Sequence, residues 1–92
     1  MEVEFVSFGP IREAVGEKTI RREVSEEATV EDLLAELATE FPALAGRLFD
    51  DDELSTWVTV TVNGTHVKQL DGGGTTLADG DVVRATPPVR GG

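Results

Sequence analysis

Cysteine is absent from this chain of 92 residues, and lysine occurs only at Lys18 and Lys68. Without cysteine, the chain has no disulfide, no thiolate ligand for zinc or an iron–sulfur cluster, and no thiol nucleophile. No apolar run approaches the length of a membrane span. The first residues, MEVEFVSF, contain no basic region of the kind that begins a signal peptide. We therefore expect a soluble cytoplasmic protein that does not enter a membrane.

Positive charge is also scarce, since 8 basic residues face 18 acidic ones and the net charge is −10. Nucleic acid is excluded as an expected partner because backbone phosphates require positive charge on the protein. An acidic surface that is poor in lysine suits a protein that must stay hydrated in high salt, where charge repulsion is screened. This composition predicts a halophilic source, with an ordinary acidic domain as the alternative.

The clearest element in the sequence is an amphipathic helix that begins after Thr29. Thr29 is a good N-cap, and Asp32 at the third helical position is close to a capping box. Apolar residues then recur at the helical period: Val30, Leu33, Leu34, Leu37, Ala38 and Phe41. Pro42 ends the helix, because the residue before a proline avoids helical dihedrals. One apolar stripe indicates that this helix packs on one surface, most simply a sheet.

Strands are predicted on both sides of this helix, where apolar and polar residues alternate or β-branched residues gather. The predicted strands are residues 2–8, 18–24, 57–62, 65–68 and 82–86. Residues 11–15 and 43–49 predict short helical turns, and Asn63-Gly64 predicts a tight hairpin. The order is an α+β arrangement, the β-grasp layout, with a mixed four- to five-stranded sheet covered on one face by one main helix. A right-handed crossover would place the first and last strands near its centre.

Other segments with polar or aromatic residues predict little chemistry of their own. The acidic run at 50–53 lacks the spaced ligands and glycine of a calcium loop, so a solvated loop is expected. The glycine run at 71–74 has no following helix and no P-loop lysine, so a flexible loop is expected. His66 has no second metal ligand and is expected on a surface hairpin. Trp57 is either an exposed contact for a partner or a cover for the sheet edge or core.

The last six residues, PPVRGG, predict a stiff spacer followed by a bare end. Pro87 and Pro88 lack a backbone N–H and fix φ, so the last strand cannot continue through them. From Pro88 to Gly92 the chain reaches at most ~17 Å at ~3.4 Å per residue. Gly91 and Gly92 have no side chains, so another protein can close tightly around them. We therefore expect one domain over residues 1–86 and a flexible tail over residues 87–92.

The terminal carboxylate is the working group that this tail predicts, with a disordered end as the alternative. A carboxylate is a poor electrophile at pH 7 and is activated most simply as a mixed anhydride with AMP. A sulfur or nitrogen nucleophile can then attack it. The sequence shows no nucleotide site, so we expect no bound cofactor. ATP would be used in trans by a partner enzyme, and this chain would be the substrate of that enzyme rather than an enzyme itself.

The whole chain resembles the ubiquitin-like MoaD/ThiS family, and within it the small archaeal modifier proteins of halophilic archaea. The resemblance rests on Phe8, Ile11-Arg12-Glu13 and Gly16, on Leu77, Asp79-Gly80-Asp81 and Val83, and on Pro87-Pro88-Val89 with Gly91-Gly92. It implies that an E1-like adenylating enzyme activates Gly92. It also implies that this enzyme recognises the tail through Pro87, Pro88, Val89 and Arg90.

The resemblance implies two alternative chemistries for the activated glycine. As a modifier, the chain would be joined by an isopeptide bond to lysines of target proteins, and a JAMM-type protease would reverse the bond. Lys18 and Lys68 would be the possible acceptors for another copy. As a sulfur carrier, the chain would carry a terminal thiocarboxylate for molybdopterin or tRNA thiolation, with a MoaE-like subunit as partner.

Two departures from the family favour the modifier. Thr86 stands where many relatives have phenylalanine, which removes an apolar contact for a molybdopterin synthase partner. Arg90 before Gly91-Gly92 is more similar to the end of eukaryotic ubiquitin. We expect a monomer without a metal site.

Overall fold

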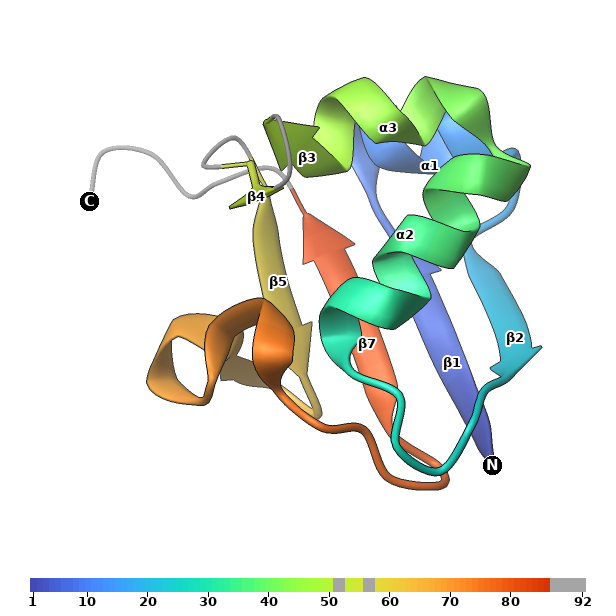
Figure 1. Cartoon of the computed structure of the whole chain (residues 1–92). Helices are drawn as coiled ribbons and strands as arrows, with labels where there is room; N and C mark the ends of the chain where they lie inside the picture. The colour runs from blue at the N-terminus through green and yellow to red at the C-terminus, as the bar shows by residue number, and fades with distance from the viewer. Residues whose placement is uncertain (51–52, 56–57, 87–92) are drawn as a thin grey trace.

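A five-stranded mixed sheet forms one layer of the molecule, and helices cover one of its faces (Figure 1). The computed structural model describes residues 1–50, 53–55 and 58–86. Within this part, the sheet order is β2-β1-β7-β5-β6. The strands are β1 (Glu2–Ser7), β2 (Thr19–Glu23), β5 (Thr59–Val62), β6 (Thr65–His66) and β7 (Val82–Thr86). β1 and β7 pair in parallel, and the other neighbours are antiparallel. The first and last strands therefore lie together inside the sheet, as the β-grasp prediction requires.

The helical layer consists of α1 (Gly9–Val15), α2 (Val30–Glu40) and α3 (Pro42–Leu48). The predicted capping box is present at the start of α2. Asp32 N donates to Thr29 Oγ1 over 3.2 Å, and Thr29 N donates to Asp32 Oδ2 over 3.0 Å. Phe41 separates α2 from α3, and Pro42 occupies the first turn of α3, where its missing N–H costs nothing. α2 is thus the main helix, and its two ends are where the sequence predicts them.

The core lies between α2 and the inner face of the sheet. Along β5, β7 and the first half of β1, buried side chains alternate with more exposed ones, in agreement with the predicted pattern, whereas Val6 and Ser7 at the end of β1 are both buried. The sheet residues that belong to the core are Val3, Phe5, Ile20, Val60, Val62, Val83 and Ala85. From α2, they are Val30, Leu33, Leu34 and Leu37, each with 0% of its surface exposed. Burying each such side chain contributes about 1.5–3 kcal/mol to folding.

One segment predicted as a strand and one predicted as a loop each contain a short 3-10 helix instead. The strand after the hairpin ends at His66, and η1 (Val67–Gln69) follows it. His66 Nδ1 accepts from Lys68 N over 3.1 Å, and Val67 is buried, so this turn has both a cap and a core contact. The glycine run forms η2 (Gly72–Gly74) rather than a flexible loop. Thr75 Oγ1 fastens η2 because it accepts from Asp71 N over 3.0 Å and donates to Gly72 O over 2.7 Å.

The two ends of the acidic run, Asp50 and Glu53, lie in short strands rather than in the predicted loop. Phe49–Asp50 (β3) pairs with Glu53–Leu54 (β4) in an antiparallel ladder. Phe49 and Leu54 are paired directly and both pack against the core, which explains the pairing of so short a segment. The strand predicted over residues 57–62 begins at Thr59, with Val58 buried before it. The predictions for Trp57 and for the tail at 87–92 lie outside the described residues.

Candidate functional site

The end of β7 is the point from which the predicted tail follows in the sequence. β7 lies between β1 and β5 in the sheet, with Ala85 opposite Ser7 on one side and Val60 on the other. Thr86, the last described residue, is opposite Thr59. α1 begins two residues after β1 ends, so it lies at the same end of the sheet (Figure 1).

The start of β7 is fastened by the turn at Asp79–Asp81, which the sequence predicts. Gly80 has a φ of 85°, a left-handed conformation that glycine adopts without strain. Glu2 N donates to Asp79 Oδ1 over 2.7 Å, and Gly80 N donates to Glu2 O over 2.8 Å. These contacts join the turn to the beginning of β1. The position of β7, and with it the point where the tail begins, is therefore set by the whole sheet.

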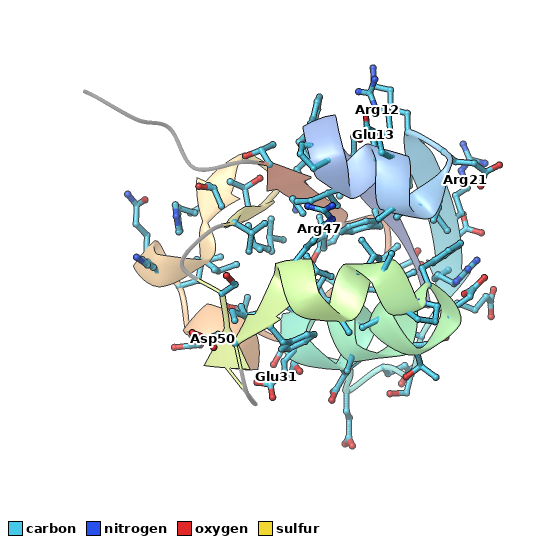
Figure 2. The ribbon with its side chains drawn as sticks, turned by 90° about the horizontal axis from the view of Figure 1, so that it is seen from above. Arg12, Glu13, Arg21, Glu31, Arg47 and Asp50 are labelled. Carbon is cyan, nitrogen blue, oxygen red and sulfur yellow. The ribbon has the colours of Figure 1, made fainter. Side chains whose placement is uncertain are left out.

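Phe8 and Arg12 form a pair beside the end of β1. Arg12 Nε donates to Ser7 O over 3.2 Å, and its guanidinium lies 5.5 Å from the centroid of the Phe8 ring. That distance is typical of a cation–π contact. The Arg12 side chain is exposed and points outward from α1, away from α2 and α3 (Figure 2). In the sequence, Phe8 and Arg12 stand out only as part of the family resemblance, which assigns no role to either residue.

The outer face of the sheet near the end of β7 carries neutral and basic side chains. Arg84 is half-buried there, opposite Val6 of β1 and Thr61 of β5. Thr86 lies two residues further on, where the resemblance leads one to expect phenylalanine. The acidic outer residues lie at the other end, where Glu4 is opposite Val82. Glu4 is paired there with Arg21, whose Nε lies 3.1 Å from Glu4 Oε1.

The two lysines lie in different parts of the fold, and both are exposed. Lys18 follows α1, and its backbone carbonyl accepts from Ser7 N over 2.9 Å, so it lies at the end of the sheet where β7 ends. Lys68 lies in η1, beyond the edge strand β6. Exposure is compatible with attack on an activated carboxyl group, and the acceptor role stays a prediction for both lysines.

The remaining candidates give no second site. His66 is half-buried, and its ring nitrogen caps η1. Among the described residues, no group of three or more histidine, cysteine, aspartate or glutamate side chains could hold a metal ion. In the same part of the chain, no helix is long and apolar enough to cross a membrane. The tail residues for which the sequence predicts activation or recognition lie outside the described residues: Pro87, Pro88, Val89, Arg90, Gly91 and Gly92.

Comparison with known proteins places this arrangement in a family. The model of the ThiS family matches residues 6–92. This chain belongs to the ThiS family. Small archaeal modifier protein 3 of Haloferax volcanii is 48% identical to this chain over 92 residues, which cover 100% of both. Small archaeal modifier protein 1 of the same organism is 37% identical over 91 residues, which are 98% of this chain and 100% of the relative.

Solved structures of similar proteins share the fold. The crystal structure of small archaeal modifier protein 1 from Haloferax volcanii superimposes with a TM-score of 0.85 at 36% identity, covering 100% of both chains. A complex of subunits 1 and 2 of the molybdopterin-converting factor from Helicobacter pylori contains a chain with a TM-score of 0.65 at 27% identity, also with 100% of both covered. Both curated relatives are small archaeal modifier proteins of Haloferax volcanii. The sequence-based prediction of a ubiquitin-like β-grasp modifier is confirmed at this level.

Proposed function

We propose that this chain is a ubiquitin-like modifier that an E1-like enzyme activates at Gly92 and that is then joined to lysines of other proteins. The observation that carries the proposal is the match, over 100% of both sequences, to small archaeal modifier protein 3 at 48% identity. The family match also extends to residue 92, so it includes the glycine pair at the end of the tail. We place the reaction in the cytoplasm, where ATP is available.

The proposed chemistry has two steps, and both use the Gly92 carboxyl group. In the first, a carboxylate oxygen attacks the α-phosphate of ATP, pyrophosphate leaves, and an acyl adenylate forms. In the second, the ε-amine of a target lysine attacks the acyl carbon and loses a proton, and AMP leaves as the isopeptide bond forms. Gly91 and Gly92 let the enzyme close around the backbone. The enzyme would recognise the tail through Pro87, Pro88, Val89 and Arg90, as the resemblance implies. A JAMM-type metalloprotease would hydrolyse the isopeptide bond and restore the free carboxylate.

Tryptic digestion provides the experiment that tests this function. Arg90 is followed by glycine rather than proline, so trypsin should cut after it and leave Gly91-Gly92 on the modified lysine. That lysine is neutral and branched, so trypsin does not cut beside it. Mass spectrometry of the digested proteome should therefore detect internal lysines that carry a Gly-Gly remnant. These should vanish when the gene for this chain alone is deleted.

The matched control is the same deletion strain that expresses a chain ending at Arg90. The strands, helices and core described above are built from residues 1–86, so we expect this shortened chain to fold and unfold as the full chain does while forming no conjugates. The proposal would be refuted if no Gly-Gly-modified lysine depended on this chain, or if the lysines lost in the deletion strain returned with the shortened chain.

Sulfur transfer is the second candidate, and the likeness to a chain of the molybdopterin-converting complex favours it. In that case a sulfide-level nucleophile would attack the acyl carbon of the adenylate, AMP would leave, and the mature protein would end in a thiocarboxylate. It would dock on a MoaE-like subunit or supply sulfur for tRNA thiolation. The intact mass of the endogenous protein separates the two chemistries. Replacing one oxygen by sulfur makes the thiocarboxylate heavier than the free acid, and mass spectrometry resolves the two. A thiocarboxylate without any dependent Gly-Gly-modified lysine would give this function first place.

A further inference from the structure

Arg12 is an exposed side chain that is nevertheless fixed in place. A surface arginine ordinarily keeps several rotatable bonds free, and ordering them on binding costs conformational entropy. Here the hydrogen bond from Nε to Ser7 O and the contact with the Phe8 ring have already restricted the side chain. A group that is ordered before its partner arrives loses less entropy on binding.

The contacts of Arg12 leave the functional end of its guanidinium available. Nε is used by Ser7 O, whereas Nη1 and Nη2 form the end of the fork that matches a carboxylate bidentately. Within the described part of the chain, the ion pairs are Arg21 with Glu4 and Arg22 with Glu40, and neither includes Arg12. Arg12 thus has no ion-pair partner among the described residues, in a chain where most charges are negative.

Strand register places this cation at the end of the sheet from which the tail follows. Arg12 binds the carbonyl of Ser7, and Ser7 is opposite Ala85, one residue before the end of β7. Arg21 is also exposed, but it is opposite Glu4, which is opposite Val82 at the start of β7. The two arginines are therefore at opposite ends of the same pair of central strands. Arg12 is therefore at the end of the sheet where β7 ends, and Arg21 is at the end where β7 starts.

We propose that Arg12, supported by Phe8, is a docking contact through which the adenylating enzyme positions this chain, and that Nη1 and Nη2 receive a carboxylate on the surface of the enzyme. The inference rests on the proposed function and names the chemistry of the partner surface. The ring of Phe8, half-buried beneath the guanidinium, excludes water from one side of the ion pair and strengthens it.

Charge complementarity explains why the contact would be a carboxylate and why it would act at short range. With a net charge of −10, the chain as a whole repels an acidic partner. At about 1 M salt, however, screening shortens the range of this repulsion to about 3 Å, while a bidentate pair shielded from water persists. Arg12 therefore sets the orientation of docking, and long-range attraction contributes little.

The test compares Arg12→Ala and Arg12→Lys with the matched control Arg21→Ala in adenylation assays with the full chain and its activating enzyme, measured as pyrophosphate release. Arg12→Ala should raise the KM for this chain about tenfold or more with kcat nearly unchanged, because a docking contact is kept throughout the reaction. Arg12→Lys keeps the charge but loses the planar fork and the stacking on Phe8. It should therefore reverse less than half of the increase in KM that Arg12→Ala causes. Arg21→Ala should leave KM within about twofold of the original value.

Thermal unfolding of each variant accompanies the kinetics. A KM for Arg12→Ala equal to that of the unsubstituted chain would overturn the inference. An equally large increase in KM for Arg21→Ala would also overturn it. Normal adenylation with fewer conjugates would assign Arg12 to another partner and would also overturn it. If the original chain is not adenylated by any E1-like enzyme of its organism, the proposed function itself fails, and that result is distinct from a variant effect.

Discussion

Asn63 Nδ2 donates a hydrogen bond to Asp81 Oδ1 over 2.8 Å, which joins the β5–β6 turn to the turn before β7. The same amide accepts through Oδ1 from Val82 N over 2.9 Å. Asn63 has a φ of 52°, and among residues with a side chain, asparagine is one of those that tolerate this left-handed conformation. The residue at this position is therefore constrained by its backbone and by both ends of its side-chain amide.

Asn63→Asp should lower the free energy of unfolding by about 1–2 kcal/mol. Aspartate tolerates the same backbone conformation and keeps the acceptor for Val82 N, so only the donor is lost and a second carboxylate faces Asp81. Chemical denaturation at neutral pH measures the effect. The exchange of both residues, Asn63→Asp with Asp81→Asn, restores a donor between them and should regain at least half of the loss. Asp81→Asn alone completes the comparison. If the double variant loses as much free energy of unfolding as the two single variants together, the hydrogen bond between these side chains is not the cause of the destabilisation.

Leu37→Ala should destabilise the fold by about 2–5 kcal/mol, because Leu37 is 0% exposed between α2 and the sheet and its removal leaves a cavity. Leu70→Ala is the matched control, since Leu70 is 41% exposed and loses the same atoms. It should change stability by no more than about 0.5 kcal/mol. Denaturant midpoints at constant m-value provide the comparison, and equal effects for the two variants would contradict the assigned core.

Gly73→Ala and Gly74→Ala should differ although they are neighbours in η2. A Cβ at Gly73 would lie 3.0 Å from Glu31 Oε2 and 3.3 Å from Glu31 Cβ, so the Glu31 side chain on α2 must shift. A Cβ at Gly74 has nothing within 4 Å, and alanine there should stabilise by about 0.4–1 kcal/mol through the unfolded state. We expect Gly73→Ala to be less stable than Gly74→Ala by about 0.5–1 kcal/mol in thermal unfolding. The reverse order would show that η2 does not pack on α2 as described.

Stability should rise with salt concentration up to the molar range. A net charge of −10 on 92 residues repels itself in the folded state, and salt shortens the screening length from about 10 Å at 0.1 M to about 3 Å at 1 M. Circular dichroism melts in potassium chloride measure the trend. Potassium sulfate at equal ionic strength separates screening from the stronger burial of apolar surface that sulfate promotes. A melting temperature that falls or stays level in chloride would remove the basis for the halophilic interpretation.

The elements that the sequence predicts correctly are those in which local and long-range signals agree. Thr29 and Pro42 mark the two ends of α2 through local chemistry, and the apolar stripe between them matches the face that the sheet buries. Asn63-Gly64 likewise combines a turn signal with flanking strands that can pair. The order of the elements then leaves few topologies, because crossover handedness restricts the rest.

The elements that the sequence does not predict depend on contacts between distant segments. β3 and β4 are two residues each, too short for a pattern, and they pair because Phe49 and Leu54 both reach the core. The turn at η1 requires the ring of His66 to bind the backbone of Lys68, which alternation cannot reveal. At the site, the tail motif is visible in the sequence, whereas the pairing of Arg12 with Phe8 and Ser7 depends on where α1 leaves the sheet.

The parallel pairing of β1 with β7 has a mechanical consequence. The N-terminus lies at one end of this pair, and β7 ends at the other, so a force that separates the two ends of the domain pulls the strands along their length. In that direction the hydrogen bonds between β1 and β7 carry the load together and must break together, whereas in peeling they would break one after another. Forced unfolding is governed by the unfolding rate rather than by equilibrium stability. A domain pulled by its tail against its first strand should therefore resist extraction far better than its modest size suggests.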